Sequence, residues 1–384
     1  MEAYLDNAAT TKCLEEVKEI VVQTMITDYA NPSAKYVKGL VAEEYIKAAK
    51  NKIAKTLKVN QKEVYFTSGG TESNNLAIIG TAMANKRAGK HIITTSIEHS
   101  AVVQPMAYLE EQGFRITYLP VNKNGLVAVT DLKAALCEDT ILISIMYVNN
   151  EIGTVEPIVE MGTFLKREYP NVLFHVDAIQ AYGKYRIFPK REGIDLLSVS
   201  GHKIHGPKGV GFLYIDEQVK IQPILWGGGQ QKGIRSGTEN VSGIAGLGVA
   251  AETAYKELEE QVKHLKSCRT HFSIRLAGLD DIVINGKEEC TTPNIISVSF
   301  KGVRSEVLLH ALEEKGISVS SGSACSTNKK IPISSVLKEV GITPDLLEST
   351  LRFSFSRYTT IEELDYCIEV LKELLPILRK YARH

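Results

Sequence analysis

The sequence has little of what marks an exported, membrane-bound or nucleic-acid-binding protein. Its 384 residues carry 45 lysines and arginines against 45 aspartates and glutamates, so the formal net charge is zero. Direct binding of nucleic acid or of an anionic membrane needs a clustered positive surface, and this balance gives no sign of one. No apolar run approaches the roughly 18 residues of a membrane span, and the first ten residues contain two acids where an export signal would be basic. We therefore expect a soluble cytoplasmic protein that binds neither nucleic acid nor membrane.

Cysteine and tryptophan are also scarce. There is one tryptophan, and the six cysteines form neither a CxxC pair nor a spacing that would bind a metal ion. In a reducing cytosol the default interpretation of each cysteine is a small buried apolar residue. The sequence therefore predicts no metal site. The cysteines are Cys13, Cys137, Cys268, Cys290, Cys325 and Cys367.

What the sequence does contain is the composition of a globular protein, with 44% hydrophobic and 23% charged residues. From residue 60 to about 215, short β-rich runs alternate with amphipathic helical stretches such as 74–86, 102–111 and 156–168. Apolar strands joined by helices indicate a mostly parallel sheet that is covered on both faces. We therefore predict an α/β domain with a seven-stranded sheet. Its strands are expected at residues 64–67, 91–96, 116–120, 141–146, 173–177, 196–200 and 210–215.

The pattern changes after a glycine-rich loop at residues 226–237. A long helical segment is expected from about 241 to 277, and shorter elements follow it. They are strands at 294–300 and 351–354 and helices at 306–315 and 361–379. This order favours a second, smaller α+β domain hinged on the long helix. We place the large domain at residues 15–258 and the small domain at residues 1–14 and 259–384.

The first stretch with chemical meaning, residues 67–75, follows a strand and opens a helix. Gly70 would let the backbone approach an anion, and the helix start that includes Thr71 offers free N–H groups, so this turn is a candidate phosphate cup. Alone the signal is weak, because such turns occur about as often without a ligand and neither common nucleotide-binding motif is matched.

Two further motifs follow predicted strands. Asp177 ends an apolar strand, where it could hold a protonated ring nitrogen while Gln180 binds a neighbouring oxygen; a helix N-cap is an equal alternative for Asp177. Lys203 lies among glycines and hydroxyls in residues 198–209 and could act as an amine nucleophile, although most lysines are solvated surface charges. An anion cup, a ring-nitrogen acid and a nucleophilic lysine together are what a pyridoxal phosphate site requires.

With these motifs the chain resembles the cysteine desulfurases of the NifS/IscS type, within the class V group of fold-type I pyridoxal-phosphate-dependent transferases. The similarity runs over nearly the whole length. Its motifs are residues 4–11, 31–33, 67–75, 98–99, 148–153, 175–180, 200–209, 227–230, 235–240, 320–325 and 352–354.

The resemblance implies a role for each cofactor-binding residue. Lys203 should bind pyridoxal phosphate as a Schiff base, and His99 should stack on its ring and help to move protons. Asp177 should keep the ring nitrogen protonated, which lets the ring draw electrons from the substrate. Gln180 and Asn150 should bind the ring oxygen and the substrate. The phosphate should be held by Gly70, Thr71, Ser200 and His202.

The resemblance also implies how the substrate and a second subunit contribute. Arg352 should grip the carboxylate of L-cysteine as a bidentate fork. Thr238 should reach the phosphate bound by the other subunit, which makes a homodimer part of the site.

Cys325 differs from the other cysteines in its surroundings. Residues 320–330 are small and polar, without an apolar period, which predicts an exposed and mobile loop. Lys329 and Lys330 favour the thiolate. The resemblance implies that this thiolate attacks the substrate sulfur, so that L-cysteine gives L-alanine and a persulfide on Cys325. The loop would then pass the sulfur to an acceptor protein, either an iron–sulfur scaffold or a thiouridylase.

Two other interpretations stay open. Another class V enzyme, such as a selenocysteine lyase or a transaminase, would not need Cys325. A non-catalytic scaffold on the same fold would not need Lys203 or Asp177, yet both are present. Tyr36 stands where many relatives have histidine, and the chain ends soon after its last expected helix, without the extension that some relatives use to bind a scaffold. The acceptor therefore stays open.

Overall fold

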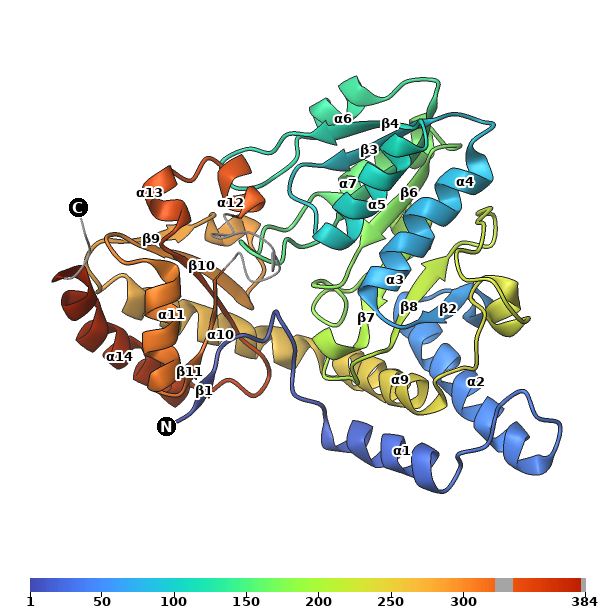
Figure 1. Ribbon diagram of the computed structural model, residues 1–384, viewed down its shortest axis with the longest axis horizontal. Helices are drawn as coiled ribbons and strands as arrows, with labels where there is room; N and C mark the ends of the chain where they lie inside the picture. The colour runs from blue at the N-terminus through green and yellow to red at the C-terminus, as the bar shows by residue number, and fades with distance from the viewer. Residues whose placement is uncertain (322–333, 381–384) are drawn as a thin grey trace.

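The computed structural model describes residues 1–321 and 334–380. Figure 1 shows two lobes side by side, each built around its own sheet, with α9 (Val241–Lys256) in the larger lobe and α10 (Leu258–Leu276) in the smaller. The long helical segment predicted over 241–277 is thus two helices that meet at Glu257, whose carboxylate accepts a hydrogen bond from Arg357 at 2.5 Å.

The larger lobe contains a seven-stranded sheet, as predicted. Its five strands from β7 to β4 are parallel to one another, while β8 runs antiparallel to both β7 and β2. In order across the sheet, the strands are β2 (Val64–Thr67), β8 (Gly211–Ile215), β7 (Leu196–Ser200), β6 (Leu173–Asp177), β5 (Thr140–Met146), β3 (His91–Thr95) and β4 (Arg115–Leu119). The predicted mostly parallel α/β architecture is confirmed.

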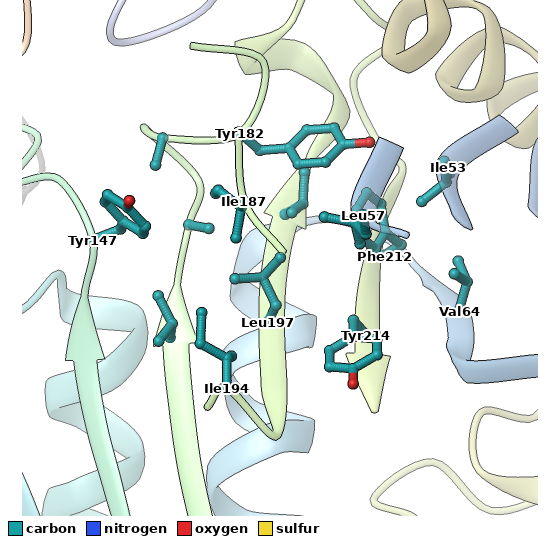
Figure 2. Packing of buried hydrophobic residues seen from close by; sticks show 14 of the residues in the cluster. Ile53, Leu57, Val64, Tyr147, Tyr182, Ile187, Ile194, Leu197, Phe212 and Tyr214 are labelled. Carbon is teal, nitrogen blue, oxygen red and sulfur yellow. The ribbon is translucent and has the colours of Figure 1, made fainter. Parts of the chain in front are cut away.

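Both faces of this sheet are covered because neighbouring strand residues point to opposite sides. Ile92 and Leu142 join a core with residues of α5 (Ser100–Glu111). Their neighbours Ile93 and Ile143 join the main core with residues of α2 (Val37–Leu57), α7 (Ile158–Glu168) and α9. Figure 2 shows part of that main core, where Leu57 lies beside Phe212. The other helices of this lobe are α1 (Glu15–Ile26), α2 (Val37–Leu57), α3 (Gly70–Asn75), α4 (Thr81–Asn85), α6 (Val129–Ala135), α7 (Ile158–Glu168) and α8 (Pro189–Glu192).

Two helical regions differ from the sequence prediction. No element was predicted before residue 60, where α1 and α2 lie; their apolar period is blurred by exposed apolar residues such as Met25 and Ile26. The helix predicted at 74–86 begins at Gly70 and contains a π turn over Leu76–Gly80. Glycine is a poor helix former, but a Cβ at position 70 would lie 2.1 Å from Cδ1 of Ile179, so a larger residue would force the Ile179 side chain to move.

The smaller lobe holds an antiparallel sheet packed against helices. The sheet runs β12 (Ser320–Ser321), β13 (Thr350–Ser354), β10 (Ile295–Phe300) and β9 (Ile282–Asn285), and a parallel pair joins β1 (Ala3–Tyr4) to β11 (Ile317–Ser318). Its helices are α10, α11 (Ser305–Glu314), α12 (Ser335–Glu339), α13 (Pro344–Leu347) and α14 (Ile361–Lys380). The domain boundaries at residues 15 and 258 stay a prediction.

The described cysteines do not share one environment. Cys268 and Cys367 are buried, and burial raises the pKa of both thiols, to about 11 for Cys268. The default interpretation of a cysteine as a small buried residue is wrong for Cys13, which is exposed. Cys137 and Cys290 are half-buried. Within residues 1–321 and 334–380, no three His, Cys, Asp or Glu side chains are grouped to hold a metal ion, and no helix is long and apolar enough to cross a membrane.

The small-lobe core gives a direct test of packing. The ring of Phe272 on α10 is fully buried, with its centroid 5.2 Å from that of Phe353 and 5.6 Å from that of Phe355. Phe272→Ala should lower the free energy of unfolding by about 3–5 kcal/mol, because it leaves a cavity. Ile274→Ala on the same helix is the control: its side chain is 67% exposed, and the change should stay within about 0.5 kcal/mol. Urea unfolding followed by circular dichroism measures both, and equal losses would contradict this account of the core.

Candidate active site

The predicted site residues gather at the carboxyl edge of the parallel strands. Asp177 ends β6 and Ser200 ends β7, while His99 and Asn150 follow β3 and β5. Since parallel strands point the same way, their carboxyl ends meet at one edge, where α/β proteins bind ligands. The sequence places these four side chains near one another through this topology alone.

A pocket of about 510 Å³ lies beside that edge. It contains four of the residues predicted to hold a phosphate, Gly70, Thr71, Ser200 and His202. Burial and the nearby cations Lys203 and Lys208 lower the pKa of His202 to about 4, so its ring is neutral. The complete lining is Ala9, Thr10, Ser68, Gly69, Gly70, Thr71, Glu72, Ser200, His202, Lys208 and Gly209.

Sequence reasoning missed the ion pair at the rim of this pocket. Glu72 accepts hydrogen bonds from the Arg235 guanidinium at 2.7 and 3.2 Å and from the backbone N–H of Ser68 at 2.8 Å. Both residues lie within motifs that were singled out, at 67–75 and 235–240, but their pairing spans 163 positions and leaves no local signal. Thr238, three residues beyond Arg235, is exposed and does not line the pocket.

Asp177 is buried and held by two donors. Its Oδ2 accepts a hydrogen bond from the Asn74 side chain at 2.7 Å, and its Oδ1 accepts one from the backbone N–H of Ile179 at 3.0 Å. Burial raises the pKa of Asp177; these hydrogen bonds and the nearby His99 and Lys203 oppose that rise. The Asp177 carboxylate caps a turn, but no regular helix follows it. The alternative that Asp177 is a helix N-cap is therefore wrong. Asn74 was not predicted as a site residue.

His99 caps α5 with one ring nitrogen. Its Nδ1 accepts a hydrogen bond from the backbone N–H of Ala101 at 3.1 Å, which leaves the proton of the neutral ring on Nε2. Burial, the largest influence, lowers the pKa of His99; Asp177 acts against it and Lys203 acts with it. The ring is therefore neutral at pH 7, with Nδ1 occupied.

Lys203 meets the N-terminal part of the chain. Its Nζ donates to the carbonyl oxygens of Ala8 and Ala9, each at 2.6 Å. The Gln180 side chain donates to the same Ala8 oxygen at 3.0 Å, and His202 Nδ1 lies 3.1 Å from Thr10 Oγ1. We call residues 6–11 the N-terminal strap. Its sequence was noted as a motif, but its contacts with the candidate lysine were not predicted.

Arg352 joins the site from the small-lobe strand β13. It is 7% exposed and donates to the backbone oxygen of Asn150 at 2.8 Å and to Oδ1 of Asp6 at 2.7 Å. The two residues predicted to bind the substrate are therefore adjacent. Asp6, at the start of the strap, was not predicted as a site residue.

Two glutamates flank these residues, of which Glu98 is buried and Glu151 is half-buried. Glu98 accepts from Thr95 and from the backbone N–H of Met146, and its burial raises its pKa well above the usual range. Glu151 accepts from Ser334 at 2.5 Å, and burial raises its pKa to about 7 although Arg352 acts against the rise. Neither glutamate was predicted as a site residue. Cys325, the predicted sulfur-carrying residue, lies outside the described residues.

A buried acid, an imidazole and a lysine lie beside this pocket of about 510 Å³, at the carboxyl edge of the sheet, and together they define a class of protein. The chain belongs to the aminotransferase class V family, whose model matches residues 3–367. A cysteine desulfurase IscS from Methanosarcina thermophila is 46% identical over 99% of this chain and 93% of its own length. A solved NifS-like protein is 38% identical, with a TM-score of 0.93 over 98% of this chain and 100% of its own. SspA, solved in complex with cysteine, is 33% identical, with a TM-score of 0.82 over 93% and 100%.

These relatives narrow the assignment from the class V family to one group of enzymes within it. The chain belongs to the cysteine desulfurase family of enzymes. The resemblance stated from the motifs is confirmed, and so is the fold-type I architecture that it implied.

The backbone beneath the pocket can be tested by adding one methyl group. A Cβ at Gly211 would lie 2.5 Å from the Val199 oxygen and 2.8 Å from Cα of Gly69, both backbone atoms. Gly211→Ala should therefore cost about 1–3 kcal/mol of stability through overpacking, and it should weaken binding of pyridoxal phosphate, the cofactor that the sequence motifs imply, because Gly69 shifts. Gly229→Ala is the control, since nothing lies within 4 Å of its Cβ position. Fluorescence titration measures pyridoxal phosphate binding, and thermal unfolding measures stability. Equal results for Gly211→Ala and Gly229→Ala would refute the proposed strain.

Proposed function

We propose that this enzyme removes sulfur from L-cysteine, with pyridoxal phosphate as cofactor, to give L-alanine and a persulfide on Cys325. The observation that supports it most is the meeting of Lys203, Asp177 and His99 at one sheet edge, next to Arg352, in a chain related to cysteine desulfurases over its length. A cytoplasmic location is part of this proposal.

The residues present fit pyridoxal phosphate. The pocket offers the cofactor phosphate the backbone of Gly70 and Thr71 and the side chains of Ser200 and His202. Asp177 would pair with the ring nitrogen, and Gln180 and Asn150 would bind the ring oxygen and the substrate. When bound, the group supplies an electron sink for the charge that develops at the substrate Cα.

His99 and Lys203 are the groups that hold and move protons. Because Nδ1 of His99 is already occupied by Ala101, the ring can offer only Nε2 to the reacting atoms. Lys203 would form the covalent link to the cofactor; when freed by substrate, its amine can rest against the Ala8 and Ala9 carbonyls that hold it here. The two groups lie near enough for each to influence the other's charge.

Arg352 would orient the substrate through its carboxylate. Its Nε is buried and has no hydrogen-bond partner among the residues that the structure describes. An unpartnered buried donor on a cation is costly, and a carboxylate ligand satisfies it. This is the chemistry expected for the α-carboxylate of an amino acid.

The sulfur step needs a thiolate at Cys325. Its sulfur attacks the substrate sulfur, so that an S–S bond forms while the substrate C–S bond breaks, and the carbon takes a proton to become alanine. The outer sulfur then passes to an acceptor protein, either an iron–sulfur scaffold or a thiouridylase. The zero net charge argues for such a protein intermediary rather than direct contact with RNA.

A homodimer would complete the site. α1, α2 and their connection carry a set of exposed large apolar side chains, and gathered apolar exposure of this kind marks interaction sites. Its residues are Val22, Met25, Ile26, Tyr29, Tyr36, Val37, Leu40 and Val41. A second copy would cover this surface, and the exposed Thr238 would reach the phosphate held by its partner.

The role of the thiol is tested by Cys325→Ser. Alanine formation from L-cysteine should fall at least about 100-fold, while pyridoxal phosphate affinity stays the same. Cys290→Ser is the matched control and should keep wild-type turnover. If Cys325→Ser still made alanine and sulfide at the wild-type rate with added thiol, the enzyme would be a selenocysteine-lyase-like or other class V enzyme, and the persulfide proposal would be wrong.

The protonation of His99 predicts the acid side of the pH profile. Because burial lowers the pKa of His99, the ring stays neutral as pH falls through its ordinary value of about 6.5. The acid limb of kcat/KM should therefore lie below pH 6.5, and His99→Gln should abolish this limb and lower the rate roughly 100-fold or more. A limb above pH 6.5 that His99→Gln removes would contradict the lowered pKa of His99, and an acid limb that the variant leaves unchanged would exclude His99 as the titrating group.

A further inference from the structure

The proposed carboxylate-binding arginine already has an acid beside it. Asp6 Oδ1 lies 2.7 Å from Nη2 of Arg352, and the two side chains are only 19% and 9% exposed. Nη1 donates to the Asn150 oxygen, and Nε has no partner among residues 1–321 and 334–380. One side of the guanidinium is therefore neutralised and fixed by Asp6, while the Nε–H donor is left without a partner in the described part of the chain.

The backbone holds Asp6 in this place. The strap runs beside the end of β13, which carries Arg352, and Asp6 forms a parallel bridge with Ser354. Ser354 N–H donates to Leu5 at 2.7 Å, its hydroxyl accepts from Ala8 N–H at 2.8 Å, and the Asn7 side chain donates to its carbonyl at 3.0 Å. Because acid and arginine are anchored to the same strand end, Asp6 stays near Arg352 when a ligand binds.

A carboxylate that approaches Arg352 thus meets a paired cation rather than a free one. It gains the unsatisfied Nε donor, but it also faces the negative charge of Asp6, and like charges at this range weaken binding. We propose that Asp6 is a positioning residue that fixes the Arg352 guanidinium and limits its affinity for the α-carboxylate of substrate and product. This inference rests on the proposed function.

The chemistry gives a reason for such a limit. L-Cysteine and L-alanine carry the same carboxylate, so a stronger grip on this group would retain the product as firmly as the substrate. Binding energy that is equal in both states lowers KM without raising kcat. An internal counter-ion keeps the arginine oriented and lets the product leave.

The test removes the charge of Asp6 while keeping its shape. Asp6→Asn retains an oxygen acceptor for Nη2. With the pyridoxal-phosphate-loaded enzyme, calorimetry should show L-alanine binding roughly tenfold more tightly than to wild type. L-Alaninamide, which lacks the carboxylate, should bind unchanged. KM for L-cysteine should fall by a similar factor, and kcat should not rise.

Two further variants separate charge from structure. Asp6→Glu keeps the charge and should restore weak alanine binding. Asp365→Asn makes the same substitution at an aspartate paired with Arg275 at 3.1 Å in the small lobe, away from the pocket, and should change neither ligand's affinity. Should Asp6→Asn not fold, Asp6→Ser removes the same charge and must also bind alanine more tightly than wild type.

The outcomes distinguish this inference from the proposed function. If wild type binds alanine and alaninamide equally, Arg352 does not recognise a carboxylate, and the substrate assignment under the proposed function fails. If wild type prefers alanine but the charge-removing variants bind it no more tightly, Asp6 does not limit affinity and this inference alone is overturned. If the charge-removing variants bound alanine and alaninamide more tightly by the same factor, this inference would also be overturned, because the effect would not act through the carboxylate.

Discussion

The site depends on one set of contacts, those of the N-terminal strap. Residues 6–11 reach Lys203 through the Ala8 and Ala9 carbonyls and Arg352 through Asp6. The strap also binds the 3₁₀ turn at Lys203, because Thr11 donates to the His202 carbonyl at 2.9 Å. Since Lys203 follows a strand of the larger sheet and Arg352 lies in the smaller sheet, the strap ties together the two groups that must act on one substrate. Partly buried hydrogen bonds of this kind fix such positions more firmly than exposed ion pairs do.

Buried and half-buried charge is the second constraint, and three such groups near the edge have compensating neighbours. Asp177 has Asn74 and a backbone N–H, Arg352 has Asp6, and Lys203 has two carbonyls. Unpaired buried charges would cost several kcal/mol each. Where compensation is incomplete, as at the Nε of Arg352, a ligand can supply it. Burial disfavours the charged form of each group, so it lowers the pKa of His99 and raises that of Asp177.

The sequence predicted the parts of the fold that local patterns encode. All seven strands of the large sheet lie where apolar runs indicated them, and the small-lobe strands β10 and β13 begin or end within one residue of expectation. The shared strand edge also brought Asp177 and Ser200 together. The pairs Asp6–Arg352 and Glu72–Arg235 could not be predicted, because they join residues 346 and 163 positions apart. α1 and α2 were missed because their exposed faces are partly apolar.

The central claim is that the sulfur of L-cysteine leaves on Cys325. The pyridoxal-phosphate-loaded enzyme should be mixed, without added thiol, with one equivalent of L-cysteine carrying a heavy sulfur isotope. Mass spectrometry of the peptide that contains residue 325, with alanine quantified in the same sample, measures the transfer. The account predicts one labelled sulfur on Cys325 for each alanine formed. Alanine formed while Cys325 stays unmodified, or the label on another cysteine, would contradict it.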